Sequence, residues 1–180
     1  MQRFTLATAF AVTCAAGFAF LACHSPRNAR APSVPGAATV AQITGVWAGR
    51  AEGTPFGDFP FALAFEREGD GSIHARTDDG KGMYLDFRFV ERAGAWVLVE
   101  VGQIPQLGKQ THTLAATDAT HWTDKDVDVA LSVTGDALVM TTAIHGKAHA
   151  TFTLQRKTGA EAEQIRAMLA KQASHTASAE

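Results

Sequence analysis

Hydrophobic residues recur at every second position through most of the chain from Ile43 to Lys157, and Gly and Asp interrupt this pattern at intervals. A period of two is the side-chain period of a β-strand, and the interruptions are typical of turns. No part of this region has the sustained 3.6-residue period of an amphipathic helix. The pattern therefore predicts an antiparallel meander, in which each strand pairs with the next along the chain.

Turn lengths predict which strand faces coincide, because a shift of one residue moves every side chain to the opposite face of the sheet. An odd loop over 68–70 brings Phe65 and Ile73 to the same face. A two-residue turn pairs Val133 with Leu138. Both turns predict a sheet with one continuous apolar face.

The last hairpin and one middle strand are harder to place. An odd loop over 145–147 would put Ala148 and Ala150 on the inner face, with His145 at the loop tip and His149 on the outer face.

The strand 96–101 is apolar on both sides, so two registers stay open. Either Trp96 and Leu98 face inward, or the Val97, Val99 and Val101 set does.

Eight to ten strands fit into the roughly 115 residues of this region, with turns spaced as in a sandwich or an up-and-down barrel. A barrel is favoured because consecutive hairpins leave no long crossover connection. The segment Ala160–Ala173 is rich in good helix formers and carries Ile165, Met168 and Leu169 on one side. The predicted fold class is all-β: an antiparallel up-and-down barrel of 8–10 strands with one C-terminal α-helix, packed against the barrel exterior or bottom.

The N-terminus has the order of a secretory signal peptide. A positive start over 1–3 precedes an uncharged apolar stretch over 4–22, which ends in Ala22-Cys23. This ending resembles the lipobox of bacterial lipoproteins, whose cysteine becomes the lipidated first residue, although Phe20 and Leu21 depart from the usual pattern. Ordinary cleavage near Ala22 and an uncleaved anchor are the alternatives.

The lipoprotein resemblance implies a place in the cell. It predicts an exported protein of the cell envelope, anchored to the membrane through lipid on Cys23. Because His24 rather than Asp follows the cysteine, the resemblance implies the outer membrane, on its periplasmic side, in a Gram-negative cell. The segment 24–42 has three prolines and few large apolar side chains, so it is predicted to be a disordered tether. The alternative is that Ala37–Ile43 begins a short helix docked below the domain.

Charge and cysteine content exclude several classes of function. The chain has 16 Lys and Arg against 18 Asp and Glu, which gives no basic stripe for nucleic-acid binding. Both cysteines, Cys14 and Cys23, precede the predicted domain. The domain therefore has no disulfide, no thiolate metal ligand and no cysteine nucleophile.

Catalytic signals are weak in the predicted domain. Neither Ser72 nor Ser132 lies in a Gly-x-Ser-x-Gly motif. Asp124, Asp126 and Asp128 alternate like the start of a calcium loop, but the Gly and the distant Glu of that loop are missing. We therefore predict no enzyme, no catalytic residue, no metal and no cofactor.

Three histidines of the predicted domain are candidate ligands. His145 and His149 are four apart, but the hairpin register separates them onto a loop and a strand. His112 faces the interior if Leu114 does, and there its imidazole could orient a bound ligand or bind haem. The alternative is an outward histidine on a polar strand.

The two ends of the predicted barrel carry a family resemblance. Gly45-Val46-Trp47 opens the first strand, Arg156 closes the last, and one helix follows, an order that resembles the lipocalins. In that family the Trp closes one end of the barrel beneath the Arg, and Trp47 and Arg156 are the matching positions. The lipocalin Thr-Asp-Tyr motif is absent. With Gly49, the opening is also similar to small β-domains of secreted bacterial proteins, and Trp47 could equally be an ordinary core aromatic.

The resulting domain organisation is a signal peptide over 1–22, a lipidated N-terminus and disordered linker over 23–42, a lipocalin-like β-barrel over 43–157, a C-terminal helix over 158–173 and a flexible tail over 174–180.

The predicted function is binding of a small apolar or amphipathic molecule inside the barrel, because small-molecule sites are concave and mostly apolar. The cavity would be elongated and open at the end away from Trp47. The alternative is a solid barrel that serves as a structural or protein-interaction module, and an enzyme is the third and weakest reading. No protein partner is predicted. The expected ligand-binding residues are Phe61, Leu63, Phe65, Leu85, Phe87, Phe89, His112, Leu131, Met140 and Phe152.

Overall fold

The structure is a computed structural model, and it describes residues 34–78, 84–104 and 108–177. The predicted signal peptide, Cys23 and most of the predicted linker lie outside these residues. The segment Pro32–Glu180 forms one compact unit that contains every element below, so it is expected to fold independently. The elements are α1 (Ala37–Ile43), β1 (Gly45–Glu52), β2 (Phe59–Arg67), β3 (Ile73–Asp78), β4 (Tyr84–Arg92), β5 (Ala95–Ile104), β6 (Gly108–Ala116), β7 (His121–Thr123), β8 (Val127–Thr134), β9 (Ala137–Ile144), β10 (Lys147–Lys157) and α2 (Gly159–Ala177).

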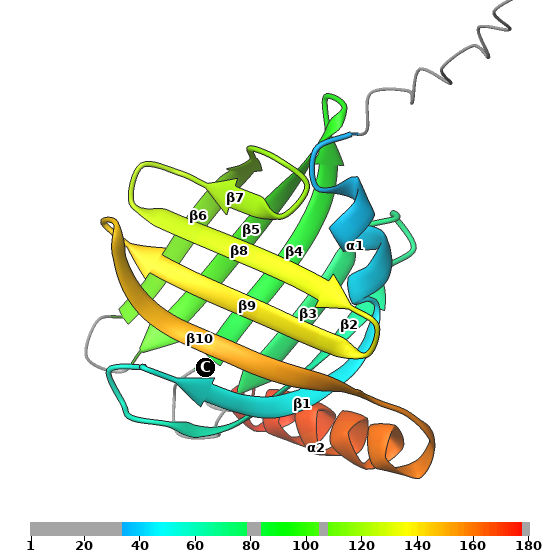
Figure 1. Cartoon of the computed structure of the whole chain (residues 1–180). Helices are drawn as coiled ribbons and strands as arrows, with labels where there is room; N and C mark the ends of the chain where they lie inside the picture. Colours follow the sequence, from blue (N-terminus) through cyan, green and yellow to red (C-terminus); the bar gives the residue numbers. More distant parts are fainter. Residues whose placement is uncertain (1–33, 79–83, 105–107, 178–180) are drawn as a thin grey trace, which may run out of the picture. The chain divides into compact units, whose positions relative to one another are not determined.

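The ten strands form a closed antiparallel barrel (Figure 1). Each strand pairs with its neighbours in the sequence, and β1 pairs with β10 to close the sheet. Among the described residues, β2 and β3 pair at Glu66 with His74 and at Arg67 with Ile73, so the closed sheet is joined by few pairs there. The predicted fold class, an all-β up-and-down barrel with one C-terminal helix, is confirmed.

One predicted register is confirmed: Val133 pairs with Leu138 across the turn between β8 and β9. The first loop is odd as predicted, so Phe65 and Ile73 share the inner face, but it is longer than predicted. Arg67 pairs with Ile73, so the loop spans residues 68–72 rather than 68–70.

The last hairpin differs from the prediction. Lys147 pairs with Ile144, so the turn has two residues, and both of them, His145 and Gly146, have positive φ. This is the backbone of the tight turn that suits a twisted hairpin. His145 does lie at the loop tip.

A β-bulge supplies the extra residue that the prediction placed in this loop. The register shifts between Ala148 and Ala150, at His149. Ala150 is buried as predicted, but Ala148 is exposed and pairs with Ala143. The prediction of an inward Ala148 is therefore wrong, because the bulge that shifts the alternation of side chains lies one residue after Ala148.

The structure resolves the register of β5. Leu98 is fully buried and pairs with Phe89 and Leu114, both buried. The inward set is therefore Trp96 and Leu98, and the same alternation turns Glu100 inward.

The segment before the barrel is partly helical. Residues 37–42, predicted as disordered linker, belong to α1, so the alternative of a docked helix is correct. Val40 and Ile43 of this helix are fully buried in the barrel core. Burial of these side chains holds a helix too short to be stable alone.

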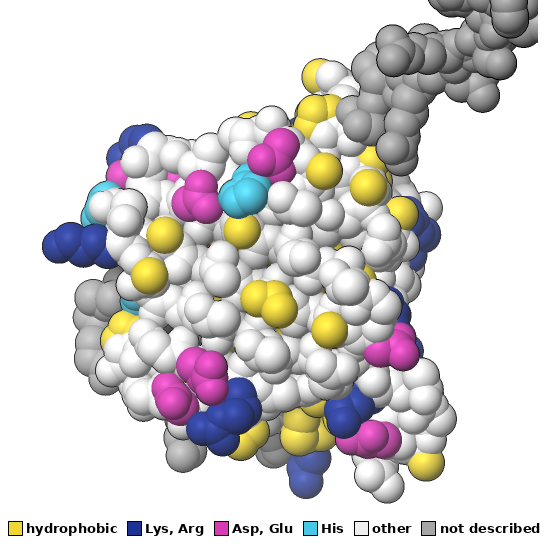
Figure 2. All heavy atoms as spheres, viewed as in Figure 1, with side chains coloured by type: hydrophobic (Ala, Val, Ile, Leu, Met, Phe, Trp, Pro, Cys, Tyr) yellow, Lys and Arg dark blue, Asp and Glu magenta, His cyan; other side chains and the backbone are white. Residues whose placement is uncertain are grey.

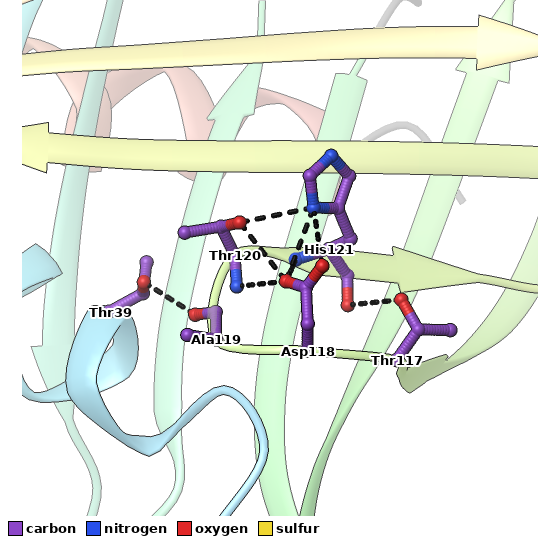
Figure 3. Close-up of polar contacts among 6 residues, drawn as sticks. All are labelled: Thr39, Thr117, Asp118, Ala119, Thr120 and His121. Carbon is purple, nitrogen blue, oxygen red and sulfur yellow. Dashed lines mark hydrogen bonds and ion pairs between the residues drawn. The ribbon is translucent and has the colours of Figure 1, made fainter.

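A rigid turn between β6 and β7 supports α1 (Figure 3). The Oγ1 of Thr39 donates to the carbonyl oxygen of Ala119, 2.7 Å away. The Asp118 carboxylate accepts backbone N–H groups from Thr120 and His121 at 2.7 and 3.0 Å. The backbone N–H of Thr120 and then the side chain of His121 lower the pKa of Asp118 most, to about 2. Asp118 is therefore an ionised acceptor at neutral pH.

The helix α2 packs against the outer faces of β1, β2 and β3. Ala162 and Leu169 are buried there, whereas Met168 is 45% exposed. The predicted apolar side of the helix is therefore wrong for Met168, because Ala162, Ile165 and Leu169 share the face that meets the sheet. Arg166 adds an ion pair of 3.2 Å to Glu66 of β2.

Candidate functional site

Trp47 seals one end of the barrel. Its side chain is fully buried, and its Nε1 donates to the carbonyl oxygen of Ile43 at 2.6 Å. The guanidinium carbon of Arg156 lies 4.1 Å from the centre of the indole ring. A cation over the face of a Trp is a favourable contact. This is the placement that the resemblance implied for Trp47 and Arg156.

Arg156 also ties the last strand to the segment that follows α1. Its Nη1 donates to the carbonyl oxygen of Thr44 at 2.7 Å, and its Nη2 donates to that of Gln42 at 2.8 Å. Its Nε lies 3.4 Å from a carboxylate oxygen of Asp136. The guanidinium therefore satisfies backbone acceptors at the end of a helix while it covers Trp47.

Two glycines of the first strand make this closure possible. Gly45 has φ +130°, and a Cβ there would lie 2.7 Å from Nη1 of Arg156. A Cβ on Gly49 would collide with the backbone carbonyl oxygen of Thr153. The Gly-x-Trp-x-Gly pattern thus has a steric basis on both sides of Trp47.

A second tryptophan fills the space beside α1. Trp122 is fully buried, its ring meets that of Phe89 edge to face with 5.4 Å between centroids, and its Nε1 donates to the carbonyl oxygen of Trp96 at 3.1 Å. We call the region formed by Trp47, Trp122, Arg156 and α1 the closed end. The indole N–H groups of both tryptophans have acceptors there.

Three titratable side chains gather inside the barrel away from the closed end. Glu100 of β5 pairs with His112 of β6, so both side chains lie on the inner face. Nδ1 of His112 lies 3.0 Å from Oδ2 of Asp124, in the turn between β7 and β8. We call the region around Leu85, Glu100, His112 and Asp124 the polar half.

The turn after β7 holds Asp124 in place. Its Oδ1 accepts the backbone N–H groups of Asp126 and Val127, each at 2.7 Å. Burial raises the pKa of Asp124, but these bonds and the contact with His112 outweigh it and leave that pKa below its usual value. Asp124 is therefore an ionised carboxylate that orients the His112 imidazole through Nδ1.

Glu100 lacks such support. Its Oε2 is sealed from solvent and has no hydrogen-bond partner among the described residues. Burial raises the pKa of Glu100, and the nearby Asp124 charge acts in the same direction, while His112 opposes them. A buried acceptor without a donor costs about 1–3 kcal/mol of stability. Such a group is a candidate for binding a ligand that brings the missing donor.

Side chains of the polar half remain partly accessible although they point into the barrel. The His112 and Asp124 side chains keep 24% and 21% of their surface accessible, and Leu85 and Thr142 are also only partly buried. At the closed end, by contrast, Val40, Ile43, Trp47 and Trp122 are fully buried. The polar half is therefore covered less completely than the core of the closed end.

The structure brings all the predicted ligand-binding residues to the inner face of the barrel. Leu85 and His112 are partly buried, and the others are buried in the core: Phe61, Leu63, Phe65, Phe87, Phe89, Leu131, Met140 and Phe152. Within this set the rings of Phe61 and Phe152 lie 4.6 Å apart. Their contact with a ligand stays a prediction.

Sequence reasoning missed Glu100 and the role of Asp124. The signal for Glu100 was the register of β5, since an inward Leu98 requires an inward Glu100 two residues later. Asp124 was considered only as a calcium ligand. In the part of the chain that the structure describes, no group of three or more His, Cys, Asp or Glu is arranged to hold a metal ion.

The outer surface offers a contrast with this interior. On the face over β8, β9 and β10, hydrophobic side chains are scattered singly among uncharged polar ones, and charges gather toward the margins (Figure 2). Scattered apolar side chains are normal for a soluble surface. This face carries no continuous apolar patch in the view of Figure 2.

Comparison with known proteins gives no family assignment: no family model, curated protein or solved structure matches the chain. Among the described residues, no helix has both the length and the hydropathy to cross a membrane. The barrel is compatible with a lipocalin-like architecture, and its site has to be interpreted from its own geometry.

Proposed function

We propose that the barrel binds a small amphipathic molecule in its polar half. The observation that carries this proposal is Oε2 of Glu100, an inward acceptor for which the described residues supply no donor. Leu85, which pairs with Gly102 two residues further along β5, is only partly buried. Ligand sites combine apolar walls with a few convergent polar groups, and the polar half has both.

The apolar part of the ligand would lie against the inner wall. Phe87 pairs with Glu100 across β4 and β5, and Leu85 lies next to Gly102 in the same ladder. Gly102 adds no side chain, and a Cβ there would first meet Leu85 at 3.6 Å. We expect micromolar affinity, about −8 kcal/mol.

The lipocalin resemblance supports the same proposal. Lipocalin barrels enclose one small ligand, and this barrel shares with them a Trp and an Arg at one end and a helix after the last strand. We further propose, from the sequence, that the protein is exported and anchored through lipid on Cys23, as an envelope lipoprotein.

A solid barrel that acts as a structural or interaction module is the second candidate. The observation in its favour is the close packing of aromatic rings, such as Phe65 with Phe89 at 6.2 Å between centroids and Phe61 with Phe152 at 4.6 Å. The two candidates differ in whether the polar half takes up a molecule.

Uptake of an uncharged apolar dye tests the binding proposal. N-phenyl-1-naphthylamine should brighten when mixed with residues 32–180, and Gly102→Leu, which fills the polar half, should weaken its binding at least tenfold. The matched control is Thr141→Leu, on an exposed position of β9, and it should bind the dye like the unaltered protein. A dye that stays dark with a folded barrel would favour the solid-barrel candidate.

Fractionation of cells tests the anchor. Cys23→Ala should move the protein from the membrane pellet to the soluble fraction or leave it unprocessed, because the attachment residue is lost. Unchanged membrane partition, together with a protein mass that contains no lipid, would contradict lipidation at Cys23.

A further inference from the structure

We propose that the ligand of the polar half is a cation: an amphipathic amine whose ammonium group contacts Glu100 and whose apolar part lies against the inner wall. This inference rests on the proposed function and names the chemical class of its ligand. Two observations support it: Oε2 of Glu100 has no hydrogen-bond partner among the described residues, and the group of titratable side chains around it is acidic.

The charges of the polar half favour a cation. Two carboxylates, Glu100 and Asp124, face one imidazole, that of His112, so the cluster is acidic when its carboxylates are ionised, whether or not the imidazole is protonated. Among the described residues of β4, β5 and β6, no Lys or Arg occupies an inward register position. Arg156 lies at the closed end, where Trp47 and backbone carbonyls occupy it.

Hydrogen bonding favours the same class of ligand. His112 uses Nδ1 for Asp124, and Asp124 uses Oδ1 for two backbone N–H groups. Oε2 of Glu100 has no donor among the residues that the structure describes. An ammonium group brings several N–H donors and a compensating charge, and charge-assisted hydrogen bonds are about twice as strong as neutral ones.

Other headgroups fit this interior less well. A carboxylate or phosphate would bring a like charge against Glu100 and Asp124 in a region of low dielectric. An alcohol would supply one donor without neutralising a charge. A buried carboxylate is stabilised most when it is both hydrogen-bonded and paired with an opposite charge.

Three ligands with the same alkyl chain test the proposal. Decylamine, 1-decanol and decanoate are each titrated against residues 32–180 loaded with N-phenyl-1-naphthylamine, at neutral pH, where the amine is protonated. We expect decylamine to displace the dye with a dissociation constant at least tenfold below that of 1-decanol, a difference of about 1.4 kcal/mol. Decanoate should bind more weakly than the alcohol.

Two variants assign this preference to Glu100. Glu100→Gln keeps the shape of the side chain and removes the charge, so the ratio of the alcohol and amine dissociation constants should fall to within threefold of one. Glu52→Gln removes an exposed carboxylate at the end of β1 and should leave the ratio as it is. Circular dichroism and thermal melting verify that each variant is folded, and Glu100→Met serves if the Gln variant is not.

The outcomes distinguish the amine assignment from the more general proposal that the barrel binds a ligand. Dye binding with no preference for decylamine, or a preference that survives Glu100→Gln, overturns the amine assignment and leaves ligand binding in place. Absence of dye binding by the folded protein overturns both. Loss of the preference in Glu52→Gln as well would attribute it to the general charge of the rim and would also overturn the assignment.

Discussion

The closed end and the polar half are built from the same ten strands, yet they treat inward polar groups in opposite ways. At the closed end, the indole N–H groups of Trp47 and Trp122 and the guanidinium of Arg156 all donate to backbone carbonyls. In the polar half, Oε2 of Glu100 has no donor among the described residues. The comparison teaches that the polar groups named at the closed end are paired within the described residues, whereas the polar half contains a buried acceptor that is not.

The largest expected effect is on the stability of the closed end. Trp47→Ala should lower the free energy of unfolding of residues 32–180 by about 3–5 kcal/mol, because it removes a fully buried aromatic side chain and leaves a cavity. Leu85→Ala in the polar half should cost less than about 2 kcal/mol, since this side chain is only partly buried. Urea denaturation measures both. A loss below about 1 kcal/mol for Trp47→Ala would show that the two regions do not differ as described.

A pair of glycine substitutions should give an intermediate effect. Gly49→Ala forces a methyl group against the backbone carbonyl of Thr153, which should cost about 1–3 kcal/mol. Gly102→Ala places its methyl group 3.6 Å from a Leu85 carbon and should change stability by less than about 1 kcal/mol. Thermal unfolding of the two variants sharpens the comparison. Equal losses would indicate that the polar half is packed as tightly as the closed end.

The smallest expected effect depends on pH and concerns Glu100. Burial raises the pKa of Glu100 in the folded protein above its ordinary value of 4.5. As pH rises past 4.5, the unfolded chain releases this proton while the folded chain still holds it. Glu100 therefore lowers the free energy of unfolding progressively until pH passes its folded pKa.

Glu100→Gln removes this penalty. The variant should gain stability relative to the unaltered protein as pH rises from 4 to 8, as followed by urea denaturation at several pH values. Glu52→Gln, on an exposed position, is the control and should show no such trend. A stability difference for Glu100→Gln that stays constant across this range would show that Glu100 titrates as it does in water.

Much of the fold could be predicted because one physical pattern dominates it. Strict alternation identified the strands, and the two-residue turn between Val133 and Leu138 set a register that the structure confirms. Which residues face inward at the start of β10 could not be predicted. A longer loop and a bulge at His149 both give the same alternation of side chains further along the strand. Met168 was wrongly predicted to face the barrel, because the buried face of α2 includes Ala162, a small residue, instead.

The site was predicted only in part, for reasons that lie in β5. Its two faces are both apolar up to Val99, so periodicity alone could not choose between them, and the inward position of Glu100 depends on that choice. The inward position of His112 followed from Leu114, which is fully buried. The contact between His112 and Asp124 crosses two strands and a turn, and no local pattern encodes it.

The antiparallel order of the strands places the entry of the chain and the polar half at different ends of the barrel. The chain enters the barrel through α1 at the sealed end, where β1 begins, while the turns after β1, β7 and β9 all lie at the opposite pole. Asp124 of the polar half lies in the turn after β7, at that pole. At the sealed end, Thr39 donates to the carbonyl of Ala119 and Arg156 to those of Gln42 and Thr44, which ties α1 to the barrel. If the barrel takes up a ligand from the opposite pole, as proposed above, binding would leave these contacts of α1 in place.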